Sequence, residues 1–269
     1  MLAIQHGDIR LDFDTQHGGR AVSWWVGEHQ LLGASSGHPI DYGMYPMAPW
    51  AGRIRGNELR QGGVAHGFSE NFSPWAIHGL VLDDPVTVVE HRANHCVLEA
   101  GFGEAWPFSG GVRCSWTLSD TGLETELEIY SCGEDFPAVG GWHPWFWRVV
   151  GGVVGRWSTD CTEILERGGD SLPTGLIRSF DPNSGPFDDA LTHGTRAVID
   201  WPGVLSIEIE NSHPWFVIFD AKDDFICIEP QTGPPDGLSG QVAPACMVTP
   251  TQPLVMRTRW QIRREPQAN

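Results

Sequence analysis

Apolar and polar residues alternate along many short stretches of this 269-residue chain. Apolar side chains fall at every second position in residues 9–13 and 205–209, and the same alternation runs through residues 123–129 and 256–262, where Thr125 and Thr258 take one of these positions each. This period of two predicts β-strands that bury one face and expose the other. Residues 120–122 precede one such stretch and predict a hairpin turn. No long stretch shows the period of an amphipathic helix.

The strand pattern predicts an all-β protein. Strands of about five or six residues would give roughly twenty strands in this chain. So many strands normally divide into packed sheets, and we therefore expect a large antiparallel β-sandwich. No linker or change of composition divides the chain, so we expect one domain over residues 1–269. Residues 33–57 and 168–196 are rich in glycine and proline, and we expect them to be long functional loops.

Charge narrows the range of partners. The net charge is −17, from 34 acidic and 17 basic side chains. Nucleic acids and anionic membranes attract basic patches, so neither is an expected partner. No apolar stretch is long enough to span a membrane, and the first residues do not resemble a signal peptide. The six cysteines are far apart, and we interpret them as reduced core residues of a cytoplasmic protein.

The first candidate for chemistry is Glu229. It follows the apolar run of residues 225–228, and Pro230 is expected to end the strand directly afterwards. A carboxylate at the end of a buried strand is costly unless it is paired or takes part in function. The alternative is a glutamate on the rim, exposed to solvent.

Four other polar residues are candidates, each with a structural alternative. His143 lies between a tryptophan and a proline in a glycine-flanked segment, which suggests a fixed orientation, although a core histidine would look the same. His78 would otherwise be a surface histidine at a strand end. Arg53 could donate a fork of hydrogen bonds to hydroxyls or could cover a strand edge. Asp188 could belong to an acidic turn.

The chain has thirteen tryptophans. Most of them must fill the core because of their volume. Trp50 and Trp145 lie in loop contexts and are the best candidates for an aromatic platform, since the C–H face of a sugar ring stacks on indole. The sequence contains no glycine-rich phosphate loop, no nucleophile elbow and no zinc-type cluster.

Five motifs together resemble the aldose 1-epimerase (galactose mutarotase) family, in its shorter, bacterial-type branch. They occur in the family's order, and the similarity extends over roughly residues 18–260. The motifs are residues 48–54 (APWAGRI), 77–79 (IHG), 141–146 (GWHPWF), 187–190 (FDDA) and 227–232 (CIEPQT). The resemblance implies the antiparallel supersandwich fold with a sugar cleft, and an isomerase that needs no cofactor or metal.

The resemblance also implies roles for individual residues. Glu229 matches the general base, His143 the general acid, and His78 a second histidine near the ring oxygen, while Arg53 and Asp188 match residues that hold sugar hydroxyls. With ordinary pKa values, Glu229 would be ionised at neutral pH, and nearby acids would help to keep His143 protonated. The chain departs from the family pattern at Gly52, where asparagine is usual, and at residues 131–133. We expect a monomer or homodimer that binds a small sugar.

Other functions fit the same residues. A glycoside hydrolase would use Glu229 and Asp188 as its two carboxylates. A non-catalytic carbohydrate-binding sandwich would need neither. A metal site could form from His78, His143 and Glu229. A mutarotase for hexose 6-phosphate or another modified sugar would need extra cations, for which Arg20 and Arg55 are candidates.

Overall fold

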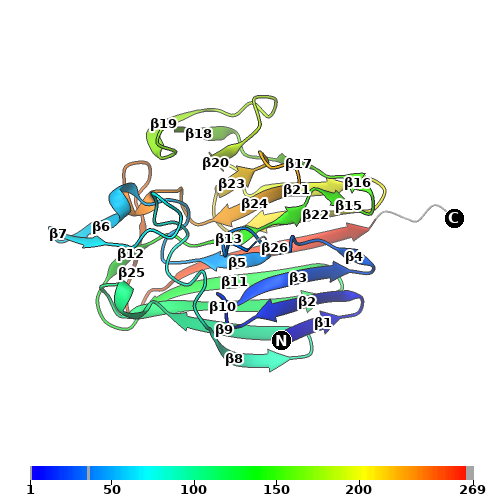
Figure 1. Ribbon diagram of the computed structural model, residues 1–269, viewed down its shortest axis with the longest axis horizontal. Helices are drawn as coiled ribbons and strands as arrows, with labels where there is room; N and C mark the ends of the chain where they lie inside the picture. Colours follow the sequence, from blue (N-terminus) through cyan, green and yellow to red (C-terminus); the bar gives the residue numbers. More distant parts are fainter. Residues whose placement is uncertain (1, 35–36, 265–269) are drawn as a thin grey trace.

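The computed structural model describes residues 2–34 and 37–264, and strands dominate it (Figure 1). Helical structure in these residues is limited to three short 3-10 turns, η1 (Arg55–Asn57), η2 (Gly103–Ala105) and η3 (Gly237–Ser239). The predicted all-β class and the absence of long helices are therefore confirmed. No helix within the described ranges is long and apolar enough to cross a membrane.

The larger sheet has twelve antiparallel strands. Its order is β1-β2-β3-β5-β13-β24-β23-β20-β18-β19, with β4 added beside β3 and β14 beside β24. The strands are β1 (Leu2–His6), β2 (Ile9–Asp14), β3 (Arg20–Val26), β4 (His29–Gln30), β5 (Met44–Met47), β13 (Gly141–Pro144), β14 (Phe146–Trp147), β18 (Glu163–Arg167), β19 (Pro173–Ser179), β20 (Asp188–Thr192), β23 (Trp215–Phe219) and β24 (Phe225–Gln231).

The second sheet has eight antiparallel strands in the order β17-β21-β22-β26-β11-β10-β9-β8. These are β8 (Thr87–Arg92), β9 (His95–Gly101), β10 (Gly110–Ser119), β11 (Gly122–Ser131), β17 (Arg156–Thr159), β21 (Arg196–Trp201), β22 (Leu205–Asn211) and β26 (Leu254–Arg264). Three two-stranded ribbons complete the fold: β6 (Glu58–Gln61) with β7 (Val64–Gly67), β12 (Phe136–Ala138) with β25 (Cys246–Val248), and β15 (Val149–Val150) with β16 (Val153–Val154).

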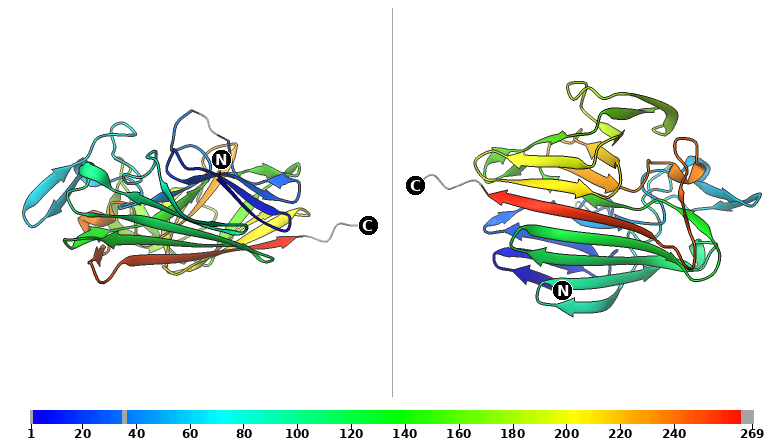
Figure 2. Two further views of the ribbon diagram at one scale, coloured as in Figure 1. Left: turned by 90° about the horizontal axis from the view of Figure 1, so that it is seen from below. Right: turned by 180° about the vertical axis from the view of Figure 1, so that it is seen from behind.

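The two sheets pack face to face, as the edge-on view in Figure 2 shows. Tryptophans from both sheets meet in the core: Trp24 of β3 lies 6.1 Å from Trp260 of β26, and Trp142 of β13 lies 4.6 Å from Trp116 of β10, between ring centroids. All four side chains are fully buried. The β-sandwich is thus held by large apolar side chains projecting from alternate positions of facing strands.

Several local predictions are confirmed. The turn expected at residues 120–122 is a hairpin: Asp120 and Thr121 form its two-residue connection, because Ser119 pairs with Gly122 between β10 and β11. In β22, Leu205, Ile207 and Ile209 are buried, and the residues between them are half-exposed. Four of the six cysteines are buried, and all six are free.

Other local predictions are wrong. Cys132 and Cys246 are exposed rather than in the core. The stretch 33–57 contains β5, and residues 35 and 36 lie outside the described residues; the stretch 168–196 contains β19 and β20. Pro230 does not end its strand, since β24 continues to Gln231. Along its edge facing β13 and β14, β24 pairs only at Phe225, Ile226 and Gln231. Pro230 lies in the unpaired part of this edge, so its missing N–H is tolerated.

Candidate active site

A cavity opens beside the central strands of the larger sheet. It encloses about 890 Å³, counting its open mouth. The hairpin of β18 and β19, which stands apart at the top of Figure 1, contributes part of its wall. Six of the seven residues predicted for the site line this cavity: Arg53, His78, His143, Trp145, Asp188 and Glu229.

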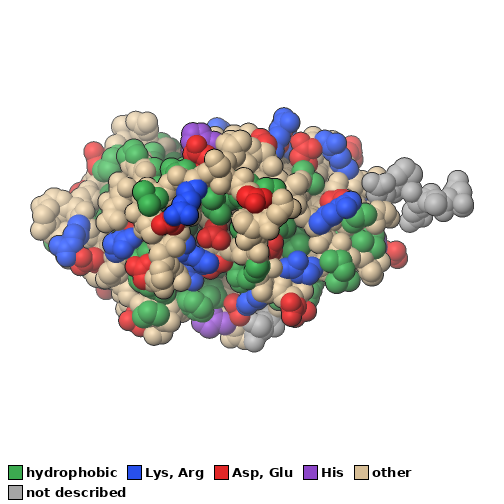
Figure 3. All heavy atoms as spheres, turned by 90° about the horizontal axis from the view of Figure 1, so that it is seen from above, with side chains coloured by type: hydrophobic (Ala, Val, Ile, Leu, Met, Phe, Trp, Pro, Cys, Tyr) green, Lys and Arg blue, Asp and Glu red, His purple; other side chains and the backbone are tan. Residues whose placement is uncertain are grey.

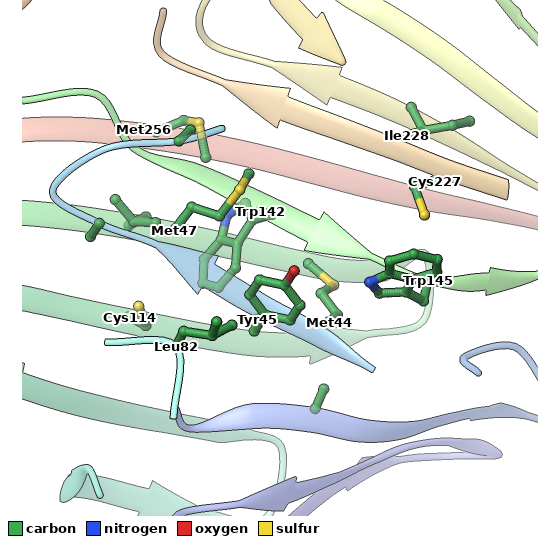
Figure 4. Close-up of a cluster of buried hydrophobic side chains, with 14 of the residues drawn as sticks. Met44, Tyr45, Met47, Leu82, Cys114, Trp142, Trp145, Cys227, Ile228 and Met256 are labelled. Atoms are coloured by element: carbon green, nitrogen blue, oxygen red, sulfur yellow. The ribbon is translucent and has the colours of Figure 1, made fainter. Parts of the chain in front are cut away.

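His143 is fixed between two aromatic rings. Its imidazole stacks on Tyr45 of β5, with centroids 5.0 Å apart, and on Trp145, with centroids 5.1 Å apart. Tyr45 is held in turn by a hydrogen bond from its hydroxyl to the Ile40 carbonyl. Tyr45 and Trp145 belong to the buried apolar cluster drawn in Figure 4. The core of the protein therefore sets the orientation of this histidine.

His143 and Glu229 form a buried pair. The distance from His143 Nε2 to Glu229 Oε1 is 3.3 Å, and the side chains are only 6% and 4% exposed. Burial raises the pKa of Glu229 well above its ordinary value, and nearby Asp188 acts in the same direction. Burial also lowers the pKa of His143 well below its ordinary value. The expectation of an ionised Glu229 beside a protonated His143 is therefore corrected: burial favours a neutral carboxyl group beside a neutral imidazole, so that the single proton of the pair lies on Glu229.

His78 comes next to this pair because its motif packs on the Arg53 motif. The backbone N–H of His78 donates to the Gly52 carbonyl, and the backbones of Arg53 and Ile77 pair as an isolated antiparallel β-bridge. The His78 ring stands perpendicular to that of His143, with centroids 4.9 Å apart. The Gly52 N–H donates to His78 Nδ1, so the neutral ring carries its proton on Nε2. Burial and Arg53 lower the pKa of His78 to about 3, which makes it a neutral hydrogen-bond donor.

Gly52 has a structural reason to lack a side chain here. Its φ is +69°, and a Cβ built on it would lie 2.7 Å from Cβ of Pro235. The space that a side chain would need is therefore filled by Pro235. Any side-chain contact made by the family's usual asparagine is absent at this position, whereas the backbone contact to His78 is present.

Arg53 and Asp188 face each other in the cavity wall. Arg53 Nη2 lies 3.9 Å from Asp188 Oδ2, and the Arg53 Nε is buried without a partner among the described side chains and backbone. A second arginine, Arg167 of β18, contacts Asp188 closely through Nη1 and reaches Asp189 Oδ1 at 3.5 Å. The sequence prediction missed Arg167, whose signal was its position directly before the glycine-rich stretch 168–196. It also missed Lys222 and Gln231, which line the cavity too.

The two predicted aromatic platforms have different environments. Trp145 lines the cavity but is only 3% exposed. The Trp145 ring stacks on His143, and Lys222 Nζ lies 4.7 Å from the centroid of the Trp145 ring. Trp50 is not part of the cavity wall: it is 2% exposed and packs on Phe68, with centroids 4.6 Å apart. Both indoles are thus enclosed by protein side chains, and Trp50 belongs to the core.

The two arginines considered for a phosphate are also placed elsewhere. Arg20 is fully buried, and its guanidinium donates to the carbonyls of His17, Pro39, Tyr42 and Leu82. Arg55 pairs with Asp236 at 3.0 Å and donates to the Pro173 carbonyl. Neither lines the cavity, because each is used to hold neighbouring segments of the chain. Within residues 2–34 and 37–264, no group of three or more His, Cys, Asp or Glu side chains is arranged to hold a metal ion.

Comparisons with known proteins identify the family and the fold. The chain is 25% identical over 264 residues to the uncharacterized protein YphB of Escherichia coli K12, covering 87% of this chain and 88% of that one. Its fold matches a galactose mutarotase-like protein from Clostridium acetobutylicum (TM-score 0.83, 18% identity, 98% and 95% coverage) and the GalM/aldose epimerase homologue from C. elegans (TM-score 0.83, 15% identity, 98% coverage of both). The sequence model of the aldose 1-epimerases matches residues 2–249, and the chain therefore belongs to the aldose 1-epimerase family.

Proposed function

We propose that this protein is an aldose 1-epimerase, an isomerase that interconverts the α and β anomers of a neutral aldose. The observation that carries the proposal is the buried pair of His143 and Glu229 in the wall of a cavity, 3.3 Å apart and beside the neutral donor His78. Opening a hemiacetal ring requires one group that removes the proton of the C1 hydroxyl and one that protonates the ring oxygen. A carboxylate and an imidazole at one place meet both requirements.

The proton count of the pair suits this reaction. In the forward step, Glu229 takes the C1 hydroxyl proton, the bond from C1 to the ring oxygen breaks, and His143 gives a proton to that oxygen. The step starts from carboxylate and imidazolium, a form that the neutral pair reaches when the Glu229 proton passes to His143 across their contact. It ends as carboxylic acid and imidazole, so the pair holds one proton before and after. Rotation about the C1–C2 bond and the reverse transfers close the ring with the other configuration. No net proton enters or leaves, as expected for a pair that burial keeps without net charge.

The neighbouring residues supply hydrogen bonds and an apolar surface. His78 Nε2–H is a neutral donor for the ring oxygen or an adjacent hydroxyl. Arg53 and Asp188 provide a donor and an acceptor for sugar hydroxyls. Leu165, Ala190 and Val217 form a small apolar cluster that lines the same cavity. Because the indoles are enclosed, we assign the C–H face of the sugar to this aliphatic wall.

The charges of the wall favour an uncharged sugar. Apart from the Glu229–His143 pair, four carboxylates line the cavity with three cations; the carboxylates are Asp41, Glu166, Asp188 and Asp189, and the cations are Arg53, Arg167 and Lys222. Arg167 contacts both Asp188 and Asp189, and Lys222 lies 3.7 Å from Asp41. Acidic and basic side chains are likewise interspersed on the surface seen in Figure 3. A phosphate would need an excess of positive charge, which this wall does not offer.

The test is polarimetry of freshly dissolved α-D-galactose and α-D-glucose with wild type and Glu229→Gln. We expect faster equilibration with wild type only, and a much smaller effect on α-D-glucose 6-phosphate. Tight sugar binding with no acceleration of any anomer would instead indicate a binding protein. Acceleration of the phosphorylated sugar alone would contradict the assignment of a neutral substrate.

A further inference from the structure

Gln231 lies next to Glu229 and contacts it directly. The two residues are two positions apart on β24, so their side chains project from the same face of the strand. Gln231 Nε2 donates to Glu229 Oε2 at 3.2 Å, while the other carboxylate oxygen faces His143 Nε2 at 3.3 Å. Both oxygens of the carboxylate are therefore engaged. Because the amide nitrogen faces this oxygen, the contact suits the carboxylate form of Glu229, which can only accept hydrogen bonds.

The other end of the amide has no partner. Gln231 is 1% exposed and lines the cavity, and its Oε1 is buried without a hydrogen bond to any described residue. An unpaired carbonyl oxygen in the interior costs free energy, so it is not explained by stability. A hydroxyl of a bound sugar would supply the missing donor.

Neighbouring residues on both sides hold the Gln231 backbone in place. Asn211 Nδ2 donates to the Gln231 carbonyl at 3.0 Å. On the opposite side, Gly141 pairs with Gln231 across the sheet, and a Cβ at Gly141 would lie 2.9 Å from Gln231 Cγ. The glycine before Trp142 thus leaves room for the glutamine side chain. The amide has little freedom to leave the carboxylate.

We propose that Gln231 is a positioning residue that aims Glu229, stabilises its ionised form, and offers its own carbonyl oxygen to a sugar hydroxyl. This inference rests on the proposed epimerase function. It predicts that loss of the amide donor makes Glu229 harder to ionise. Ring opening would then require a higher pH, since only the carboxylate can accept the C1 hydroxyl proton.

The experiment compares Gln231→Leu and Gln231→Glu with wild type. In Gln231→Leu, the midpoint of the acidic limb of the kcat/KM profile should shift to higher pH by on the order of one unit. At pH values below this midpoint, kcat/KM should then be about tenfold lower than in wild type. Gln231→Glu should move the limb further, because a second carboxylate then stands beside the first. KM should rise in Gln231→Leu, which has no acceptor oxygen. The matched control is Gln30→Leu, since Gln30 of β4 lies outside the cavity wall and its Oε1 accepts hydrogen bonds from the backbone N–H groups of Trp24 and Leu32. Its profile should coincide with that of wild type.

A second readout does not depend on activity. In protein with ¹³C-labelled glutamate, the carboxyl signal that Glu229→Gln removes reports the titration of Glu229. Its midpoint should rise in both Gln231 variants. Wild type that accelerates no sugar would contradict the epimerase proposal, while this titration would still test the contact. Active wild type with unchanged limbs and midpoints in both variants would overturn the role of Gln231.

Discussion

The imidazole of His143 lies parallel to the indole of Trp145, with an interplanar angle of 10° and ring centroids 5.1 Å apart. The edges of the same indole meet Phe219 and Phe225, with centroids 5.7 and 5.5 Å away. Because these contacts immobilise the indole, they also limit rotation of the imidazole. Trp145 therefore orients the histidine rather than serving as an open platform for the sugar.

Replacing Trp145 by phenylalanine should separate this role from simple stability. The smaller ring leaves space beside His143, and a misplaced acid can cost up to about a hundredfold in rate. We expect kcat to fall by about ten- to a hundredfold and stability by about 1–3 kcal/mol. Trp50→Phe is the control, because Trp50 is equally buried but lies outside the cavity wall. It should lose similar stability and keep its activity; equal losses of kcat in both variants would contradict the orienting role.

Glu229→Gln should abolish most of the catalysis without unfolding the protein. A positioned proton transfer contributes on the order of 10² to 10⁴ in rate, so kcat should fall by that factor. The melting temperature should stay the same or rise, since burial already disfavours the charged carboxylate. Polarimetry and thermal melting measure the two effects. Glu124→Gln, at a site 60% exposed on the other sheet, is the control and should be silent in both; a variant at Glu229 with full activity would exclude it as the base.

Much of the fold was predictable from local pattern. The alternation of Leu205, Ile207 and Ile209 needs only a sheet with one buried face, and the structure contains it. The prediction that Pro230 ends its strand was wrong because the effect of a proline depends on which neighbouring strand pairs at that point. This pairing is a property of the sheet rather than of the segment. Register and strand neighbours are long-range properties.

In the site, too, some features were predictable from the sequence and others depend on the fold. The resemblance named the residues of the acid and base pair, but not the effect of burial, which moves the pKa values of Glu229 and His143 in opposite directions. Trp50 and Trp145 have similar loop-like sequence contexts, yet only the packing of distant segments decides which one reaches the cavity. Arg167 was missed for a related reason, since its partner Asp188 is 21 residues away along the chain.

Arg167→Met should weaken substrate binding more than it slows the chemical step. The variant removes the cation that holds Asp188 and Asp189, and a hydrogen bond to a charged group is worth about 1.5–3 kcal/mol. If part of this energy orients Asp188 toward the sugar, KM should rise on the order of tenfold with little change in kcat. Arg156→Met is the control, because Arg156 pairs with Asp200 at 3.1 Å on the smaller sheet, away from the cavity wall. An unchanged KM in Arg167→Met would show that Asp188 keeps its orientation without the arginine.

His78 should make the folded protein sensitive to acid. Its pKa in the fold is about 3, compared with an ordinary value of 6.5. Between these two values the unfolded chain binds a proton that the folded protein does not. The free energy of unfolding therefore falls as pH falls through this window, by up to about 1.4 kcal/mol per pH unit for this residue. His143 acts in the same direction, since burial also lowers its pKa.

His78→Asn removes the contribution of His78 to the acid sensitivity and is compatible with the backbone conformation at this position. The φ of His78 is +61°, a conformation that asparagine tolerates well. Urea unfolding of wild type and variant at pH 7 and pH 4.5 should show a smaller acid-dependent loss in the variant, by on the order of 2 kcal/mol. His193→Asn is the matched control, because His193 has a φ of +60° and a side chain that is 65% exposed. Its stability should follow wild type at both values of pH. If wild type and His78→Asn lose stability in parallel, His78 gains its proton as readily in the folded protein as in the unfolded chain. His78 would then be a charged donor at the site rather than a neutral one.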